Sequence, residues 1–183
     1  MLYISKGILI TEKDGRCCVF RRGTEFHLTR TETEIWKAGR DRLCESDAFL
    51  TLEDMEDEGL ISIAENNSEK SIYDLLCDCM FIPQQHPNDN NPLTATESIL
   101  YVWLRDAGIR LTTAELICLC EQDIAPAQNL LGESNRQVLV SAIYLNNDVN
   151  DFTLEDLMIS AKCKDWVIAG LLSLVQKQYL YIG

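Results

Sequence analysis

The chain has 183 residues, 46% of them hydrophobic and 25% charged, and its formal net charge is −13. This is the composition of a globular protein, and the negative charge disfavours nucleic acid as a partner unless positive charge gathers on one face. The first residues lack a basic region followed by a long apolar run, and no run reaches the roughly 20 apolar residues of a membrane span. We therefore expect a soluble, cytoplasmic protein without membrane contacts.

A three-stranded antiparallel meander is predicted over residues 8–28. Two apolar runs flank an Asp-Gly pair at 14–15, which is a strong signal for a two-residue hairpin turn. An Arg-Gly pair at 22–23 then leads the chain into a third run. Side chains alternate along a strand, so one of the adjacent Cys17 and Cys18 should face the core and the other the surface.

Helices are predicted after the meander. Overlapping capping-box patterns begin at Thr29 and Thr31 and indicate a helix start, because a hydroxyl and a carboxylate can satisfy the free amide groups there. A second start lies near Ser46. A third helix is predicted over 51–58, with Gly59 as its terminator.

A boundary between two domains is predicted at residues 83–92. Before it, a strand is expected over 60–63, and the apolar residues 71–82 fit a strand and a helix equally well. Residues 83–92 hold three prolines, three asparagines and no aliphatic residue, which is typical of a linker. We therefore predict a first domain at 1–82, made of the meander and three helices, and a second domain at 93–183.

The second domain is predicted to be helical. Hydroxyl residues cap several of its helix starts, and apolar side chains recur at helical spacing. The expected helices cover 94–107, a segment from Thr112, 135–145, a segment from Thr153 and 165–178, and a short strand follows at 179–182. The whole chain is thus expected to be α+β but mostly helical.

Two segments resemble known domains. From 135 to 182 the order is helix, helix-turn-helix and strand, which resembles the end of a winged helix-turn-helix domain. Residues 23–36 read GTEFHLTRTETEIW and resemble PqqD-like domains, the recognition elements of ribosomal peptide modification. In those, a strand leads through a leucine into a polar cap and a helix bearing isoleucine and tryptophan. The resemblances imply two small winged-helix-like domains.

The PqqD-like resemblance also implies a peptide-binding groove. In that family a leader peptide is held as an added strand along the third strand and against the third helix. The third strand of a small meander is an edge, and its unpaired backbone groups can template another strand. The implied peptide-binding residues are Arg21, Arg22, Thr24, Glu25, Phe26, His27, Leu28, Leu52, Met55, Glu56 and Asp57.

The sequence contains no recognisable catalytic or metal-binding motif. It has no phosphate-binding loop and no nucleophile elbow. The Cys-x-Cys pairs at 77/79 and 118/120 lack the spacing of structural zinc ligands. Several of the eight cysteines lie in apolar runs and should be reduced core thiols, while His27 and His86 should have structural or surface roles. We therefore expect no enzyme, no metal and no cofactor.

The leading hypothesis is an adaptor that binds a peptide or protein partner. The acidic run at 53–58 would suit a basic peptide, and it equally fits the solvated face of a short helix. The alternative is a winged-helix transcription regulator. Its DNA contacts would come from Arg136, Lys162, Lys164 and Lys177. The acidic helix argues against this alternative, because DNA phosphates would repel it.

Overall fold

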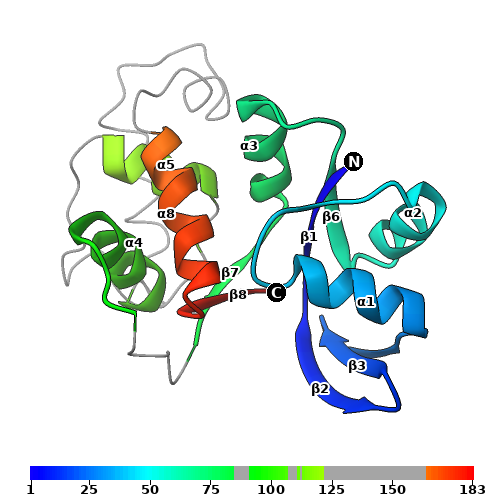
Figure 1. Cartoon of the computed structure of the whole chain (residues 1–183). Coiled ribbons are helices and arrows are strands. Elements are labelled where there is room, and N and C mark those ends of the chain that lie inside the picture. The colour runs from blue at the N-terminus through cyan, green and yellow to red at the C-terminus, as the bar shows by residue number, and fades with distance from the viewer. Residues whose placement is uncertain (85–90, 107–110, 112, 122–163) are drawn as a thin grey trace.

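The computed structural model describes residues 1–84, 91–106, 111, 113–121 and 164–183 (Figure 1). These residues contain eight strands and six helices. In chain order they are β1 (Leu2–Ser5), β2 (Ile8–Lys13), β3 (Arg16–Arg21), β4 (Thr24–His27), α1 (Arg30–Gly39), β5 (Cys44–Glu45), α2 (Phe49–Asp57), β6 (Ile61–Ala64), α3 (Glu69–Cys77), β7 (Phe81–Pro83), α4 (Ala95–Asp106), α5 (Thr113–Glu121), α8 (Lys164–Gln176) and β8 (Leu180–Ile182). The strands form three small antiparallel sheets, ordered β5-β1-β6, β2-β3-β4 and β7-β8.

The predicted fold class, a mostly helical pair of winged-helix-like domains, is corrected by these sheets to a mixed α+β fold. Strand β1 went unpredicted because all four of its residues are buried, so it lacks the alternation that marks a half-buried strand. No helix starts at Ser46, which lies in the short connection between β5 and α2, so the starts predicted near 46 and at 51 correspond to the single helix α2. The ambiguous residues 71–82 divide between α3 and β7.

The predicted meander is confirmed as β2-β3-β4. Both connecting turns have two central residues with positive φ, 53° and 73° at 14–15 and 48° and 88° at 22–23. This backbone matches the twist of the flanking strands and is the reason an Asp-Gly pair predicts a hairpin. The expectation that only one of Cys17 and Cys18 is buried is wrong, since they are 2% and 7% exposed.

Helix α1 packs on the meander and on β1, and their buried residues form the first core together with residues of α2 and β6. Its capping box is confirmed: the Glu32 amide donates to Oγ1 of Thr29, and the Thr29 amide donates to Oε2 of Glu32 at 2.7 Å. The indole Nε1–H of Trp36 donates to the Lys6 carbonyl at 2.8 Å. The Tyr3 hydroxyl donates to the Ile35 carbonyl at 3.1 Å. These bonds fix α1 against the end of β1.

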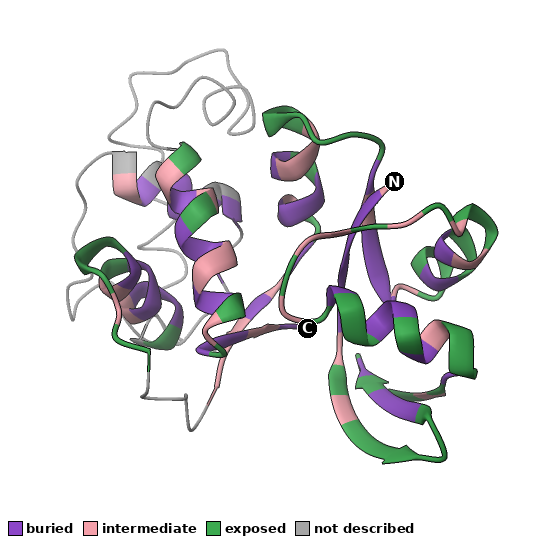
Figure 2. Cartoon of the chain, viewed as in Figure 1, coloured by how far each residue is buried: buried purple, intermediate pink, exposed green. Residues whose placement is uncertain are grey.

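The second core combines elements from both sides of residues 83–92. It contains buried residues of β1, β6, α3 and β7 together with residues of α4, α5, α8 and β8, and Figure 2 shows buried segments running through both groups. Strand β7 pairs with β8, and Oγ1 of Thr113 donates to the Leu76 carbonyl at 2.8 Å. The division into two separable domains stays a prediction. Separating the two halves would break these contacts.

The predicted helix starts at Thr94 and Thr112 correspond to α4 and α5, and the predicted final helix and strand correspond to α8 and β8. The Thr94 amide donates to Oε2 of Glu97 at 2.7 Å, as the capping pattern predicts. The helices expected at 135–145 and from Thr153 lie outside the described residues. None of the described helices has the length and apolar character needed to cross a membrane.

Limited proteolysis should cut the chain between Pro83 and Pro92, because exposed polar segments are the preferred sites of nicking. We expect the two fragments to stay associated afterwards, since β7 pairs with β8 and the second core draws on both. Gel filtration of the nicked protein measures this. Fragments that separate without denaturant would show that the shared contacts are weak and that the two halves are independent.

Candidate functional site

Strand β4 is an edge strand of the meander, and no strand among the described residues pairs with its outer side. The Leu28 amide donates to the Cys17 carbonyl at 2.9 Å. In an antiparallel pair, residues whose backbone groups point toward the partner alternate with residues whose groups point away. The amide and carbonyl groups of Glu25 and His27 therefore point away from β3, where they can pair with another strand.

The implied peptide-binding residues fall into two groups by burial. Arg22, Thr24, Glu25, His27, Glu56 and Asp57 are exposed, Phe26 is intermediate, and Arg21, Leu28, Leu52 and Met55 are buried. Leu28, Leu52 and Met55 pack together in the first core. The residues of β4 thus lie at or near the surface, while the apolar side chains of Leu52 and Met55 in α2 face the core.

The acidic face of α2 lies beside β6. The Ile63 amide donates to Oε1 of Glu56 at 3.2 Å, so this carboxylate covers a backbone donor of β6, an edge strand of its sheet. Such a cover blunts an edge that would otherwise attract a further strand. No described side chain covers the outward backbone groups of β4 in this way.

A buried positive charge lies near the 22–23 turn. Arg21 is 7% exposed and Lys6 is 6% exposed, and neither forms an ion pair with a described residue. Burial lowers the pKa of both groups and neighbouring arginines lower it further, while Cys79 raises the pKa of both and Asp78 raises that of Lys6. Nε of Arg21 is buried without a hydrogen-bond partner in the described parts of the chain. Because buried charges are normally paired, this cluster should attract an anionic group.

Gly59 makes room for the Arg21 guanidinium. A β-carbon at this position would collide with Nη1 of Arg21. Gly59 also has a φ of 73°, as expected for the glycine that ends α2. The residue predicted only as a helix terminator therefore also determines where the buried positive charge lies.

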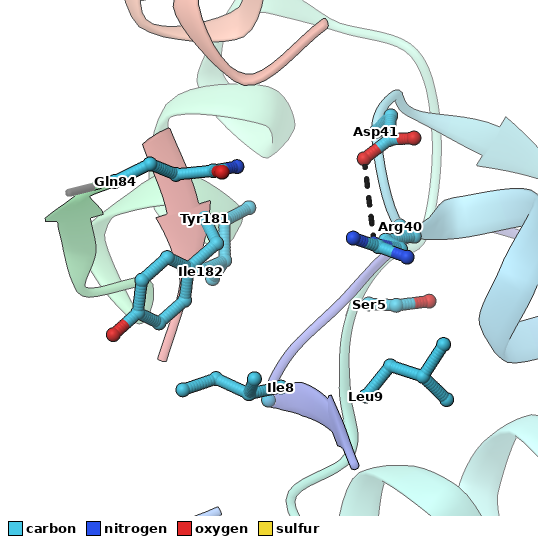
Figure 3. A pocket seen from close by; sticks show the side chains of 9 residues that line it. Ser5, Ile8, Leu9, Arg40, Asp41, Gln84, Tyr181 and Ile182 are labelled. Atoms are coloured by element: carbon cyan, nitrogen blue, oxygen red, sulfur yellow. Dashed lines mark ion pairs between the residues drawn. The ribbon is translucent and has the colours of Figure 1, made fainter. Parts of the chain in front are cut away.

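Two cavities lie where the start of β2 meets β8. In the first, of about 190 Å³, side chains of Gln84, Tyr181 and Ile182 face those of Arg40 and Asp41 across the opening (Figure 3). The second, of about 310 Å³, has mostly apolar walls with two arginines at one side. It is lined by Gly7, Ile8, Phe20, Arg21, Arg22, Gly23, Met80, Ile82, Tyr181 and Gly183. A ligand with an anionic group beside an apolar one fits the second cavity best.

Most of these cavity residues were missed at the level of sequence. Met80, Ile82 and Tyr181 come from β7 and β8, whose pairing is not readable from local patterns. Sequence patterns also did not predict the burial of Lys6, which lines neither cavity, because a lysine after an apolar run is ordinarily exposed to water. Of the residues that line the second cavity, only Arg21 and Arg22 were named from the sequence as site residues, as part of the expected peptide-binding groove.

The residues suggested for DNA binding do not form a surface among the described residues. Arg136 and Lys162 lie outside them, and Lys164 begins α8 with a side chain that is not described. Lys177 is engaged in contacts within the chain: its Nζ lies 2.7 Å from Oε2 of Glu97 and donates to the Pro92 carbonyl.

No family model matches this chain, and neither the curated proteins nor the solved structures contain a significant match. The resemblances to winged-helix and PqqD-like domains therefore stay hypotheses.

Proposed function

We propose that the protein is a binding protein that captures an extended peptide segment as an added strand along β4. The observation that carries this proposal is the pair of outward-facing backbone groups on Glu25 and His27, which no described strand occupies. Strand addition draws its affinity from main-chain hydrogen bonds and its specificity from nearby side-chain pockets. It needs no catalytic residue.

The surroundings of β4 favour a peptide with an acidic residue next to a bulky apolar one. Arg22 is exposed at the turn that opens β4, and the apolar cavity with Arg21 begins at the same turn. A carboxylate there would partly neutralise the buried cations, and an apolar side chain would fill the walls formed by Phe20 and Met80. The alternative of DNA regulation has less support, because Lys177 is the only one of its four suggested contact residues with a described side chain, and Lys177 is paired with Glu97.

Replacing Glu25 by proline should weaken peptide binding at least tenfold and leave the fold intact. The amide that proline removes points away from β3, so no sheet hydrogen bond is lost, whereas the added strand loses its donor. Phe26→Pro is the matched control, since its amide points toward β3 and its loss should destabilise the hairpin. We expect at least a tenfold drop in affinity for Glu25→Pro, on the order of the 1.4 kcal/mol that one hydrogen bond can contribute.

The probe is an array of short peptides that combine acidic and apolar residues, followed by titration of the binders into the full-length, isotope-labelled protein. Amide NMR shifts should be largest in β4 and at Arg22. Binding that Glu25→Pro leaves unchanged, or shifts confined to α4, α5 and α8, would rule out β4 as the binding edge.

A further inference from the structure

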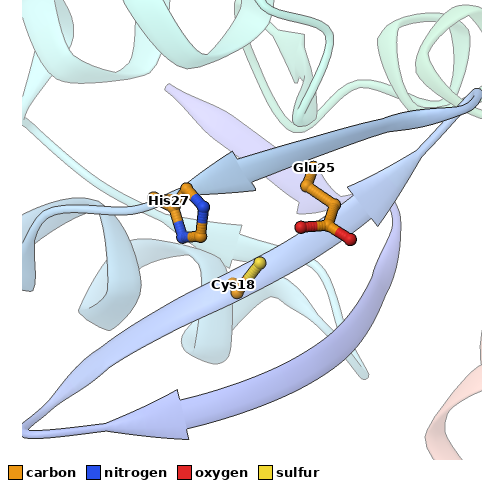
Figure 4. A group of neighbouring side chains, drawn as sticks. All are labelled: Cys18, Glu25 and His27. Carbon is orange, nitrogen blue, oxygen red and sulfur yellow. The ribbon is translucent and has the colours of Figure 1, made fainter.

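The outer face of the meander brings three potential metal ligands together. Cys18 on β3 and His27 on β4 are directly opposite each other, and Glu25 lies two residues before His27 on the same face. Their ligand atoms, a sulfur, a ring nitrogen and a carboxylate oxygen, all lie within 4.8 Å of one another. Figure 4 shows the three side chains rising from neighbouring strands on one side of the sheet.

The register of the hairpin explains this proximity. Since the Leu28 amide bonds to Cys17, the facing residues Val19 and Phe26 form the next hydrogen-bonded pair, and Cys18 and His27 form a non-hydrogen-bonded pair between them. Residues in such pairs approach more closely, with α-carbons about 4.5 Å apart. A thiol and an imidazole in this position need only small rotations to share one ion.

We propose that Cys18, Glu25 and His27 bind a zinc ion, with a fourth coordination position left open to solvent or to a ligand. Zinc takes thiolate, imidazole and carboxylate ligands at about 2.0–2.3 Å in a tetrahedral arrangement, which separates neighbouring ligand atoms by about 3.5 Å. The ligand atoms here need to close by about 1 Å from their widest separation. Glu25 and His27 are exposed and free to rotate, while the buried sulfur of Cys18 lies at the base of the site.

The three side chains are available as ligands, because no hydrogen bond or ion pair to a described residue occupies Cys18, Glu25 or His27. The mixed sulfur, nitrogen and oxygen set suits zinc better than calcium or magnesium, which prefer oxygen alone.

The zinc site does not depend on the proposed peptide binding, because it uses side chains of β3 and β4 and not the outward backbone groups of β4. Glu25→Gln separates the two ideas. It removes a zinc ligand but keeps the amide and carbonyl that would pair with a peptide. Peptide binding should therefore survive Glu25→Gln, whereas zinc affinity should fall.

The test is titration of the reduced full-length protein with Zn²⁺, followed by calorimetry, and with Co²⁺, followed by absorption. We expect one ion per chain and a near-ultraviolet thiolate-to-cobalt band that Cys18→Ser abolishes. His27→Gln and Glu25→Gln should each weaken zinc binding by more than about tenfold, since even loss of a supporting hydrogen bond costs 10–100-fold in metal sites. Cys44→Ser, Glu45→Gln and His86→Gln are the matched controls and should change nothing.

Circular dichroism verifies that each variant remains folded. Absence of stoichiometric zinc binding, or a cobalt band that persists in Cys18→Ser, would overturn the proposal. Zinc binding that the three control variants weaken as much as the ligand variants do would also overturn it, because the ion would then lie elsewhere.

Discussion

Replacing Trp36 by alanine should destabilise the protein by about 3–5 kcal/mol, the range found for removal of a fully buried large aromatic side chain. Trp36 is 1% exposed and packs in the first core with Tyr3, Val19 and Leu28. The same substitution leaves the Lys6 carbonyl without its indole donor. Since small domains have about 5–15 kcal/mol of stability in total, such a loss is a large part of it.

The matched comparison replaces each of two buried tryptophans, Trp36 and Trp103, by phenylalanine. Trp103 is as buried as Trp36, but its Nε1–H has no hydrogen-bond partner among the described residues. Trp36→Phe should lower the stability by about 1–3 kcal/mol more than Trp103→Phe does, because only Trp36→Phe leaves a buried acceptor, the Lys6 carbonyl, without a donor. Urea denaturation followed by circular dichroism measures both, since loss of a tryptophan complicates fluorescence. Equal costs would show that the Trp36–Lys6 bond contributes nothing.

Replacing Glu97 by glutamine should destabilise the contact between α4 and α8 by about 3 kcal/mol. The Glu97 side chain is 6% exposed and pairs with Lys177, which is 24% exposed, and Ser173 also donates to it. Loss of one partner of a buried pair costs about 3–5 kcal/mol, and the lower end applies because Lys177 keeps contact with water. Urea denaturation at neutral pH measures the loss. Glu12→Gln, which breaks the exposed pair with Lys37, is the control and should have a much smaller effect.

The effect of Glu97→Gln should disappear at low pH. Burial alone would raise the pKa of Glu97, but hydrogen bonds from Lys177, Ser173 and Thr94 outweigh it and lower the pKa from 4.5 to about 2. A carboxyl group with a lowered folded-state pKa stabilises the protein above its unfolded pKa, and this contribution is lost as the pH falls through the folded value. The difference between wild type and variant should therefore be constant above pH 4.5 and shrink toward pH 2. If the difference in stability persists at the lowest pH, the loss in Glu97→Gln comes from the shape of glutamine and not from its missing charge.

Sequence patterns predicted the elements that are determined locally. The two-residue turns at 14–15 and 22–23 and the capping residues Thr29 and Thr94 act within a few residues of themselves, and all four are present as expected. Strands β1 and β5 were not predicted and residues 71–82 were left open between strand and helix, because these strands lack a local alternating pattern and their partners lie far away in the sequence. Without these strands the expected fold was more helical than the structure.

Each candidate site likewise has features that the local sequence determines or features that depend on packing by distant elements. The register of β3 and β4 follows from the turn at 22–23, so the pairing of Cys18 with His27 was contained in the sequence once that turn was accepted. The burial of Arg21 and Lys6 was not, because it depends on Gly59 and on strands from the other side of the chain. Local rules predict which residues face each other in a hairpin, but not what later packs over them.

The position of β1 between β5 and β6 has a consequence for how the chain folds. The meander closes through two-residue turns, so its hairpins should form within microseconds, whereas Leu2 has to find Ala64 across the meander, α1 and α2. Until then β1 is an apolar strand with two free edges, the kind of segment that aggregates or recruits a chaperone. We expect the amides of β1 to gain protection from hydrogen exchange later than those of the meander. We also expect a high concentration of unfolded chains to reduce the yield of refolding more than its rate.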